Sequence, residues 1–185
     1  MTDDQDRKPG ATALEAVSNA RRLSRERGDG KIRVLFVCLG NICRSPAAEG
    51  VATSIAVERG VSDRFEFDSA GFYGGHAGSL PDLRMRRAAS YRGYTLEHHS
   101  RTVKLSDYSY FDIILGMDDA NIDDLHDHAP TLDDLRKIAR MSDFATAFPS
   151  ARSVPDPYYE GAEGFELVLD LLEDACSNLL TLLLK

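Results

Sequence analysis

The sequence predicts an α/β fold in which helices cover both faces of a parallel sheet. Two short apolar runs, residues 32–37 and 111–115, are rich in the β-branched and aromatic residues typical of buried parallel strands. A third run, Phe65-Glu66-Phe67, also indicates a strand. Segments with helical spacing separate these runs, and strands that alternate with helices form parallel sheets with right-handed crossovers.

The helices are predicted in the following order. Residues 46–59 follow the first strand, with Ser45 as a cap and Pro46 in the first turn. Residues 81–91 and 117–126 form the next two helices, and Arg92-Gly93 marks a loop after the first of them. Residues 165–184 form the longest helix, with a core-facing stripe made of Phe165, Val168, Leu169, Leu171, Leu172, Ala175, Leu179 and Leu180.

Composition narrows the possible classes of protein. The chain has 185 residues, of which 43% are hydrophobic and 28% charged, enough for one domain with a substantial core. No apolar run approaches the roughly 20 residues of a membrane span, and residues 1–6 are polar and acidic, unlike a secretory signal. A net charge of −8 disfavours non-specific binding to nucleic acid. We therefore expect a cytoplasmic protein with neither a membrane nor a nucleic-acid partner.

The cysteines and histidines indicate no structural cross-link. The odd, low count of Cys38, Cys43 and Cys176 argues against a disulfide framework and fits a reducing compartment. The pairs His98-His99 and His126/His128 lack matching thiolates, so we interpret them as surface histidines and predict no metal site.

The chain divides into two parts near residue 30. Residues 1–30 are interpreted as an N-terminal extension, because the start is polar and Arg-Gly-Asp-Gly at 27–30 is typical of a linker. Between them, residues 11–25 have apolar side chains at rough helical spacing, so this segment is either a docking helix or a disordered extension. Residues 31–185 are predicted to form a single domain.

The segment Cys38-Leu39-Gly40-Asn41-Ile42-Cys43-Arg44-Ser45 joins the first strand to the helix that follows it. Ligands of open parallel sheets bind at the carboxyl ends of the strands. A helix N-terminus there offers unpaired amides and a partial positive charge, and Gly40 lets the backbone turn so that successive N–H groups point inward. The segment therefore predicts a binding site for phosphate.

Three side chains of this segment suggest chemistry. The Cys38 thiol, which faces amides and an arginine, is expected to be ionised at neutral pH and to attack phosphorus. Arg44 can hold two phosphate oxygens with its planar fork and stabilise the transition state. Ser45 can donate a hydrogen bond to the sulfur and make it a better leaving group. Cys-x5-Arg alone is common by chance, but the strand before it and the Ser-Pro helix start after it make this interpretation specific.

A thiolate nucleophile also needs a proton donor for the leaving group. The best candidate is Asp156 in Val154-Pro155-Asp156-Pro157-Tyr158-Tyr159, where two prolines restrain the backbone around the carboxylate. The same residues are typical of a surface turn, so it is the phosphate-binding segment that favours a general acid here.

Together these motifs resemble the low-molecular-weight protein tyrosine phosphatase family. Residues 34–46 are similar to its signature and residues 156–159 to its acid loop. Residues 68–71 and the stretches at 111–112 and 117–118 are similar to inner segments of the family. The resemblance covers residues 31–185 and implies a four-stranded parallel sheet flanked by helices, with no metal and no cofactor.

The resemblance also implies roles for individual residues. Cys38 is the nucleophile, Arg44 the phosphate clamp and Asp156 the general acid. Leu39, Gly40, Ile42 and Cys43 belong to the phosphate-binding loop, and Cys43 matches a second cysteine that forms a reversible disulfide with Cys38 under oxidation. The polar residues that hold the loop open are Asn41, Ser45 and Ser69. The aromatic residues beside the pocket are Tyr158 and Tyr159.

Two positions depart from the family pattern. Gly75 stands where relatives often carry an aromatic wall of the substrate slot, so Phe72 or Tyr73 would have to compensate or the slot would be wider. Arg92 stands where many members have a histidine, so one link that supports the loop is expected to differ.

The predicted function is hydrolysis of phosphotyrosine in proteins, and of small aryl phosphates, through a phosphocysteine intermediate. Thiol-dependent arsenate reduction is one alternative, but it needs relay cysteines, and Cys176 lies in an apolar helix. Phosphoarginine hydrolysis is another, although Ile42 offers an apolar wall for an aromatic ring. A non-catalytic phosphate-binding module is the third. The physiological substrate and the oligomeric state stay open.

Overall fold

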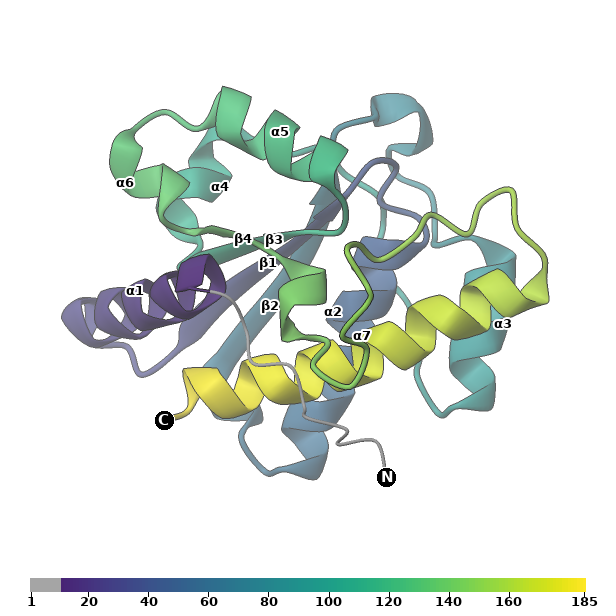
Figure 1. Cartoon of the computed structure of the whole chain (residues 1–185), viewed down its shortest axis with the longest axis horizontal. Coiled ribbons are helices and arrows are strands. Elements are labelled where there is room, and N and C mark those ends of the chain that lie inside the picture. Colours follow the sequence, from purple (N-terminus) through teal and green to yellow (C-terminus); the bar gives the residue numbers. More distant parts are fainter. Residues whose placement is uncertain (1–10) are drawn as a thin grey trace.

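Four parallel strands form the centre of the structure, a computed structural model that describes residues 11–185 (Figure 1). The expectation for the polar start, residues 1–6, lies outside the described residues. The strands are β1 (Ile32–Cys38), β2 (Phe65–Gly71), β3 (Ile113–Gly116) and β4 (Ile138–Arg140), in the order β2-β1-β3-β4. All pairs are parallel, so the predicted four-stranded parallel sheet is confirmed.

Helices cover both faces of this sheet. On one face lie α1 (Ala11–Arg27), α2 (Arg44–Glu58), α3 (Leu83–Tyr91) and α7 (Ala162–Leu183). On the other lie α4 (Leu105–Tyr110), α5 (Asp119–His128) and α6 (Leu132–Leu135). Short 3₁₀ turns occur at Ser62–Arg64, Gly74–His76 and Met141–Phe144. Among the described residues, no helix has both the length and the apolar character needed to cross a bilayer.

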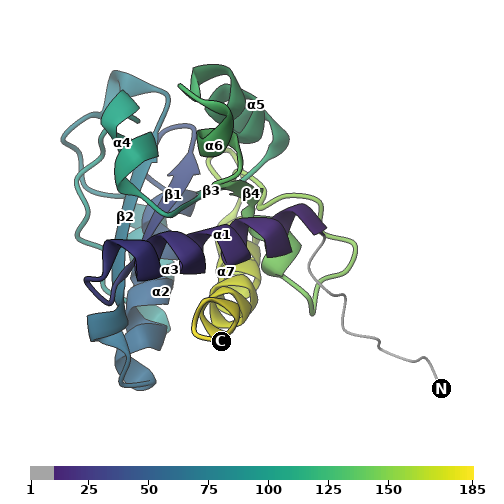
Figure 2. The same ribbon diagram turned by 90° about the vertical axis from the view of Figure 1, so that its left-hand side faces the viewer.

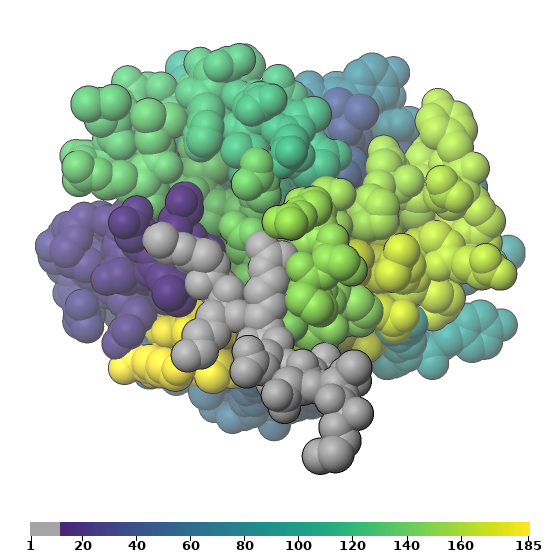
Figure 3. Space-filling view, in the orientation of Figure 1, coloured from purple at the N-terminus to yellow at the C-terminus, as the bar shows by residue number. Residues whose placement is uncertain are grey.

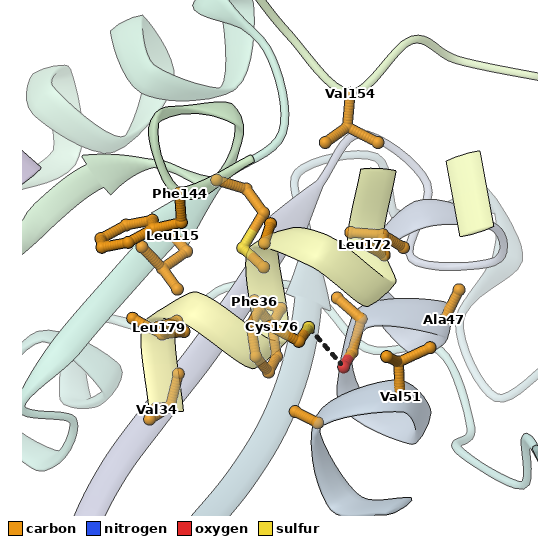
Figure 4. Close-up of a cluster of buried hydrophobic side chains, with 14 of the residues drawn as sticks. Val34, Phe36, Ala47, Val51, Leu115, Phe144, Val154, Leu172, Cys176 and Leu179 are labelled. Atoms are coloured by element: carbon orange, nitrogen blue, oxygen red, sulfur yellow. Dashed lines mark hydrogen bonds between the residues drawn. The ribbon is translucent and has the colours of Figure 1, made fainter. Parts of the chain in front are cut away.

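The central strand β1 is buried on both faces because successive side chains of a strand point to opposite sides. Val34 and Phe36 join the cluster beneath α2 and α7, whereas Leu35 and Val37 join the cluster beneath α4 and α5. Every residue of the predicted stripe on α7 is buried, which confirms it as core. Figure 4 shows part of this core, in which the Cys176 thiol lies 3.6 Å from the Ala48 carbonyl oxygen.

Several element boundaries differ from the sequence prediction. The helix α2 starts at Arg44 rather than at Pro46, so Ser45 lies inside its first turn and does not cap it. The strand β4 has three residues and the helix α4 six, too few for a periodic pattern to appear, and neither was predicted. The helices predicted at 81–91, 117–126 and 165–184 are present, each shifted by a few residues.

Residues 11–27 form a helix that packs on the sheet. Helix α1 contacts α7, β1, β3 and β4, and its side chains Ala13, Ala16, Val17 and Ala20 are buried. The Arg27 guanidinium donates to both carboxylate oxygens of Asp112, at 2.6 and 2.9 Å. Figure 2 shows α1 crossing the sheet, and in Figure 3 its purple surface lies between the green α5–α6 region and the yellow end of α7.

Candidate active site

The loop after β1 lies where the strand order changes direction. The chain leaves β1 for β2 on one side and returns to β3 on the other, and ligands of open sheets bind at such points. The left-handed residue of this loop is Asn41, whose φ is +53°, and not Gly40, where the turn was predicted. Asparagine tolerates this left-handed conformation better than most residues.

The loop presents main-chain donors. In the part of the chain that the structure describes, the N–H groups of residues 39–43 donate to no protein acceptor. They stand directly before the N-terminus of α2, whose partial positive charge adds to theirs. The end of β2 approaches closely, since a Cβ on Gly71 would lie 2.5 Å from the Leu39 carbonyl oxygen. This arrangement suits a tetrahedral anion.

Cys38, at the end of β1, is held beneath the loop by a directed hydrogen bond. Its sulfur lies 3.0 Å from the Ser45 hydroxyl oxygen. The Asn41 side-chain amide donates to that same oxygen at 2.7 Å, so the hydroxyl proton is free to point at the sulfur. The other acceptor near this hydroxyl, the Ala70 carbonyl, is farther away at 3.4 Å. Ser45 can therefore stabilise a Cys38 thiolate.

The Arg44 side chain is buried and fixed from two sides. One guanidinium nitrogen donates to Asp118 at 2.6 Å and to the Val154 carbonyl oxygen at 3.1 Å. Asp118 is itself held, because its other carboxylate oxygen accepts from the Asn121 N–H at the start of α5. These contacts bring the loop after β1 next to the loop that leads to α7, as Figure 1 shows. The guanidinium is thus oriented in advance, as a phosphate clamp requires.

Asp156 comes from the loop before α7 and lies at the mouth of the same pocket. Its Oδ2 lies 3.5 Å from the other guanidinium nitrogen of Arg44, and its Oδ1 accepts from the Tyr158 N–H at 3.1 Å. The carboxylate is about half exposed, so it can reach a bound substrate and exchange a proton with water.

These groups meet in one pocket of about 350 Å³. Most of the residues predicted for the site line it: Cys38, Leu39, Gly40, Ile42, Cys43, Arg44, Asp156, Tyr158 and Tyr159. Asn41, Ser45 and Ser69 lie buried behind it. Tyr73 also lines it, as one of the two residues considered in place of the missing wall at Gly75. His76, which was not predicted for the site, lines it as well. Polar groups lie at the floor and aromatic rings at the rim.

A hydrogen-bonded network supports the loop from behind. Asn41 donates to Ser69 at 3.0 Å, and the Ser69 hydroxyl donates to Glu49 at 2.7 Å. Asn41 Oδ1 accepts from the Arg101 N–H and lies 2.9 Å from His98 Nε2, so that ring nitrogen carries a proton. The interpretation of His98 as a surface histidine was therefore wrong.

Glu49 and His98 are adjacent in this network. The Nδ1 of His98 lies 3.2 Å from Glu49 and 3.5 Å from Asp68. Burial raises the pKa of Glu49 to about 7 and lowers the pKa of His98, while the charge of Asp68 opposes the shift at His98. One proton between the two side chains then satisfies both, which keeps a net charge out of this half-buried site.

The same three side chains bring possible metal-ligand atoms within 4.8 Å of one another. Each is already engaged: His98 with Asn41, Glu49 with Ser69, and Asp68 with Arg101 at 2.8 Å. The guanidinium beside Asp68 also opposes a bound cation. We therefore assign these residues to support of the loop.

The other two thiols differ from Cys38 in their surroundings. Burial raises the pKa of Cys43 and of Cys176 well above the usual range, which keeps both protonated at neutral pH. Cys176 is fully buried in α7, as part of the hydrophobic core. Arg92 stands where many relatives have a histidine, and we expected one support of the loop to differ there. In the structure Arg92 forms ion pairs with three carboxylates of α7, those of Glu166, Asp170 and Glu173.

Comparison with known proteins agrees with this geometry. The family described as low molecular weight phosphotyrosine protein phosphatase matches residues 33–185. A relative from Synechocystis is 44% identical over 83% of this chain and 98% of its own. A low molecular weight phosphotyrosine protein phosphatase of Rattus norvegicus is 34% identical over 82% of this chain and 95% of its own.

Solved structures are similar as well. A protein tyrosine phosphatase from Entamoeba histolytica, with Hepes in its active site, superposes with a TM-score of 0.79 at 44% identity, covering 82% of this chain and 96% of that one. A Drosophila arginine phosphatase superposes with a TM-score of 0.76 at 29% identity, covering 81% and 95%.

The fold and the loop define a cysteine-dependent phosphatase. More narrowly, the chain belongs to the low molecular weight phosphotyrosine protein phosphatase family, as its sequence motifs predicted. The match begins at residue 33, so helix α1 lies outside the region that the family shares.

Proposed function

We propose that this protein hydrolyses phosphotyrosine in proteins with Cys38 as nucleophile, Arg44 as phosphate clamp and Asp156 as general acid. The observation that carries the proposal is the convergence of these three side chains on one pocket whose loop also offers unpaired amides. Arg44 is buried and oriented, which suits binding of the phosphate oxygens. Asp156 is about half exposed, which suits proton transfer to and from the substrate and water.

The first step transfers the phosphoryl group to the enzyme. The Cys38 thiolate attacks phosphorus in line with the tyrosyl oxygen, and a sulfur–phosphorus bond forms. The phosphorus–oxygen bond breaks with its electron pair on the tyrosyl oxygen, which takes the proton of Asp156. The loop amides and Arg44 bind the three equatorial oxygens, where charge is carried in the transition state.

The second step releases phosphate. Water attacks phosphorus and gives a proton to Asp156, which now acts as a base. The sulfur–phosphorus bond breaks and returns the electron pair to sulfur. The Ser45 hydroxyl, directed at the sulfur by Asn41, stabilises the departing thiolate.

Trapping the intermediate tests this assignment. Acid quench of the enzyme during turnover of p-nitrophenyl phosphate should leave a phosphoryl group on Cys38, detectable by mass spectrometry of the peptide. Cys38→Ser should remove both label and turnover, whereas Cys43→Ser should keep both. Turnover by Cys38→Ser protein at the normal rate would overturn the proposal.

Phosphoarginine hydrolysis is the second candidate, because a structure described as an arginine phosphatase superposes well on this chain. The apolar Ile42 and the tyrosines of the pocket support an aromatic substrate instead. Comparing kcat/KM on phosphotyrosine and phosphoarginine peptides distinguishes the two. Arsenate reduction has no support from Cys176, which is buried in the core.

Two further expectations belong to this proposal. Residues 31–185 would form the phosphatase domain and α1 an appended helix, in line with a family match that starts at residue 33. The protein would act in the cytoplasm, where a nucleophilic thiol stays reduced; its three cysteines are free in the structure. Cell fractionation tests the location, and a variant of α1 described below tests the division.

A further inference from the structure

The segment after β2 supplies one wall of the pocket mouth. Tyr73 and His76 from this segment line the pocket together with Cys38. Phe72, the neighbouring aromatic residue, instead packs against the hydrophobic cluster beneath α4 and α5, and the centroid of its ring lies 5.5 Å from that of His128. Of the two aromatic residues considered as replacements for a wall at Gly75, Tyr73 is therefore the one placed to contact a substrate.

The main chain of Tyr73 is tied to the phosphate-binding loop. The N–H groups of Tyr73 and Phe72 both donate to the Leu39 carbonyl oxygen, at 2.8 and 2.9 Å. His76 approaches the loop too, since a Cβ on Gly40 would lie 3.3 Å from its ring. The start of this segment is thus tied to the phosphate-binding loop, and its end lies close to the same loop.

Gly75 provides the space that the Tyr73 ring occupies. A Cβ on Gly75 would lie 2.3 to 2.5 Å from three atoms at the outer end of the ring. Gly75 is absent from the residues with positive φ, so its backbone conformation is open to alanine. What a side chain there would meet is the Tyr73 ring itself.

The ring is also part of a continuous aromatic rim. The Tyr73 and His76 rings meet edge to face with centroids 5.5 Å apart, and the His76 and Tyr158 centroids are 6.4 Å apart. Tyr73 is 54% exposed, so it keeps surface available for another ring. Aromatic pairs in such arrangements gain about 0.5–1.5 kcal/mol beyond simple burial.

We propose that Tyr73, seated over Gly75, is a specificity-determining residue that contacts the aromatic ring of the substrate and thereby selects aryl phosphates. The inference rests on the proposed function, because it concerns the same pocket. Removing the ring should weaken binding of the phenyl group and leave phosphate binding and the chemical step intact.

The first test compares two variants of Tyr73. Tyr73→Ala should raise KM for a phosphotyrosine peptide about three- to tenfold, the factor that one lost aromatic contact predicts, with kcat within about twofold. The inhibition constant of inorganic phosphate, which lacks a ring, should not change. Tyr73→Phe keeps the ring and should behave like the wild type. An unchanged KM in Tyr73→Ala would overturn the proposal.

The second test uses the two neighbouring glycines. Gly75→Ala should displace the ring and raise KM as Tyr73→Ala does, and combining the two substitutions should add nothing further. Gly74→Ala is the matched control, because its Cβ would meet Thr102 at an ordinary 3.5 Å and its φ is also outside the positive region. Additive effects of Gly75→Ala and Tyr73→Ala would contradict the seating of the ring.

These outcomes stay separate from a failure of the proposed function. If Cys38 were not the nucleophile for aryl phosphates, the wild-type protein itself would show no turnover of phosphotyrosine. If only the role of Tyr73 were wrong, wild-type turnover would persist and the KM of Tyr73→Ala would match it.

Discussion

The phosphate-binding loop, residues 38–45, and the mouth segment, residues 72–76, face the same pocket but are built differently. In the loop, Cys38, Asn41, Arg44 and Ser45 are at most 2% exposed. Hydrogen bonds join Ser45 to Cys38 and to Asn41, while Asp118 and the Val154 carbonyl hold Arg44. The mouth segment is largely exposed, contains two glycines and touches the pocket through rings. The proposed catalytic groups are thus held by a buried polar network, whereas the proposed contact with the substrate ring lies on an open surface that can change without disturbing that network.

A substitution in the buried phosphate-binding loop should cause the largest loss of activity. Arg44→Lys keeps the charge but loses the planar fork and its contacts to Asp118 and Val154. We expect kcat/KM for p-nitrophenyl phosphate to fall by about a hundred- to a thousandfold, with a higher inhibition constant for phosphate. Arg84→Lys, at an exposed arginine beside Tyr158, should change kcat/KM little. Equal losses in the two variants would contradict the special role of Arg44.

A substitution of Asp156, the proposed proton donor at the edge of the pocket, should cause the second-largest loss of activity. Asp156→Asn cannot donate a proton, so kcat should fall by about a hundredfold on phosphotyrosine and clearly less on an aryl phosphate with a more acidic leaving group. The measurement is the dependence of kcat on leaving-group pKa, which should steepen in the variant. Glu160→Gln, in the same loop, is the control. An unchanged dependence would remove Asp156 from the role of general acid.

A substitution remote from both regions should affect stability alone. Arg27→Ala leaves the buried carboxylate of Asp112 without its partner from α1. We expect the free energy of unfolding to fall by about 2 kcal/mol, with kcat/KM unchanged, because α1 packs on the sheet away from the pocket. Arg22→Ala removes only an exposed pair on the same helix and should cost less than about 0.5 kcal/mol. A large loss of kcat/KM in Arg27→Ala would contradict the separation of α1 from the phosphatase domain.

The network behind the loop should affect the pH dependence of stability. The pKa of Glu49 is about 7 in the folded protein against an ordinary value of 4.5, so this group binds more protons when folded. Its contribution to stability is therefore full below pH 4.5 and is lost as the pH rises through about 7, whereas His98, with a lowered pKa, acts in the opposite sense.

Glu49→Gln should remove the first of these contributions. Urea unfolding between pH 5 and 8 should then show a decline in stability smaller than in the wild type by about 1–3 kcal/mol. Glu97→Gln, at an exposed position, should follow the wild-type curve. Identical curves for Glu49→Gln and the wild type would show that this carboxyl titrates normally.

Much of the fold was predictable because its patterns are local. The apolar run of β1 and the stripe on α7 each signal a buried element through side chains close in sequence. The strand β4 was not predicted, because three residues are too few to show an alternation of apolar and polar side chains. Its place in the sheet depends on pairing with β3. The start of α2 was misplaced because Ser45 resembles a cap, whereas its hydroxyl is directed at Cys38.

The loop between Cys38 and Ser45 was predictable from local sequence, because a phosphate-binding nest is made from consecutive amides and the helix start that follows them. Tertiary contacts determine which distant groups support it: Asp118 beside Arg44, and His98 and Glu49 behind Asn41. They also select Tyr73 over Phe72 as the ring at the pocket. These partners have no local signal, since each contact joins segments that are far apart in the sequence and meet only in the folded sheet.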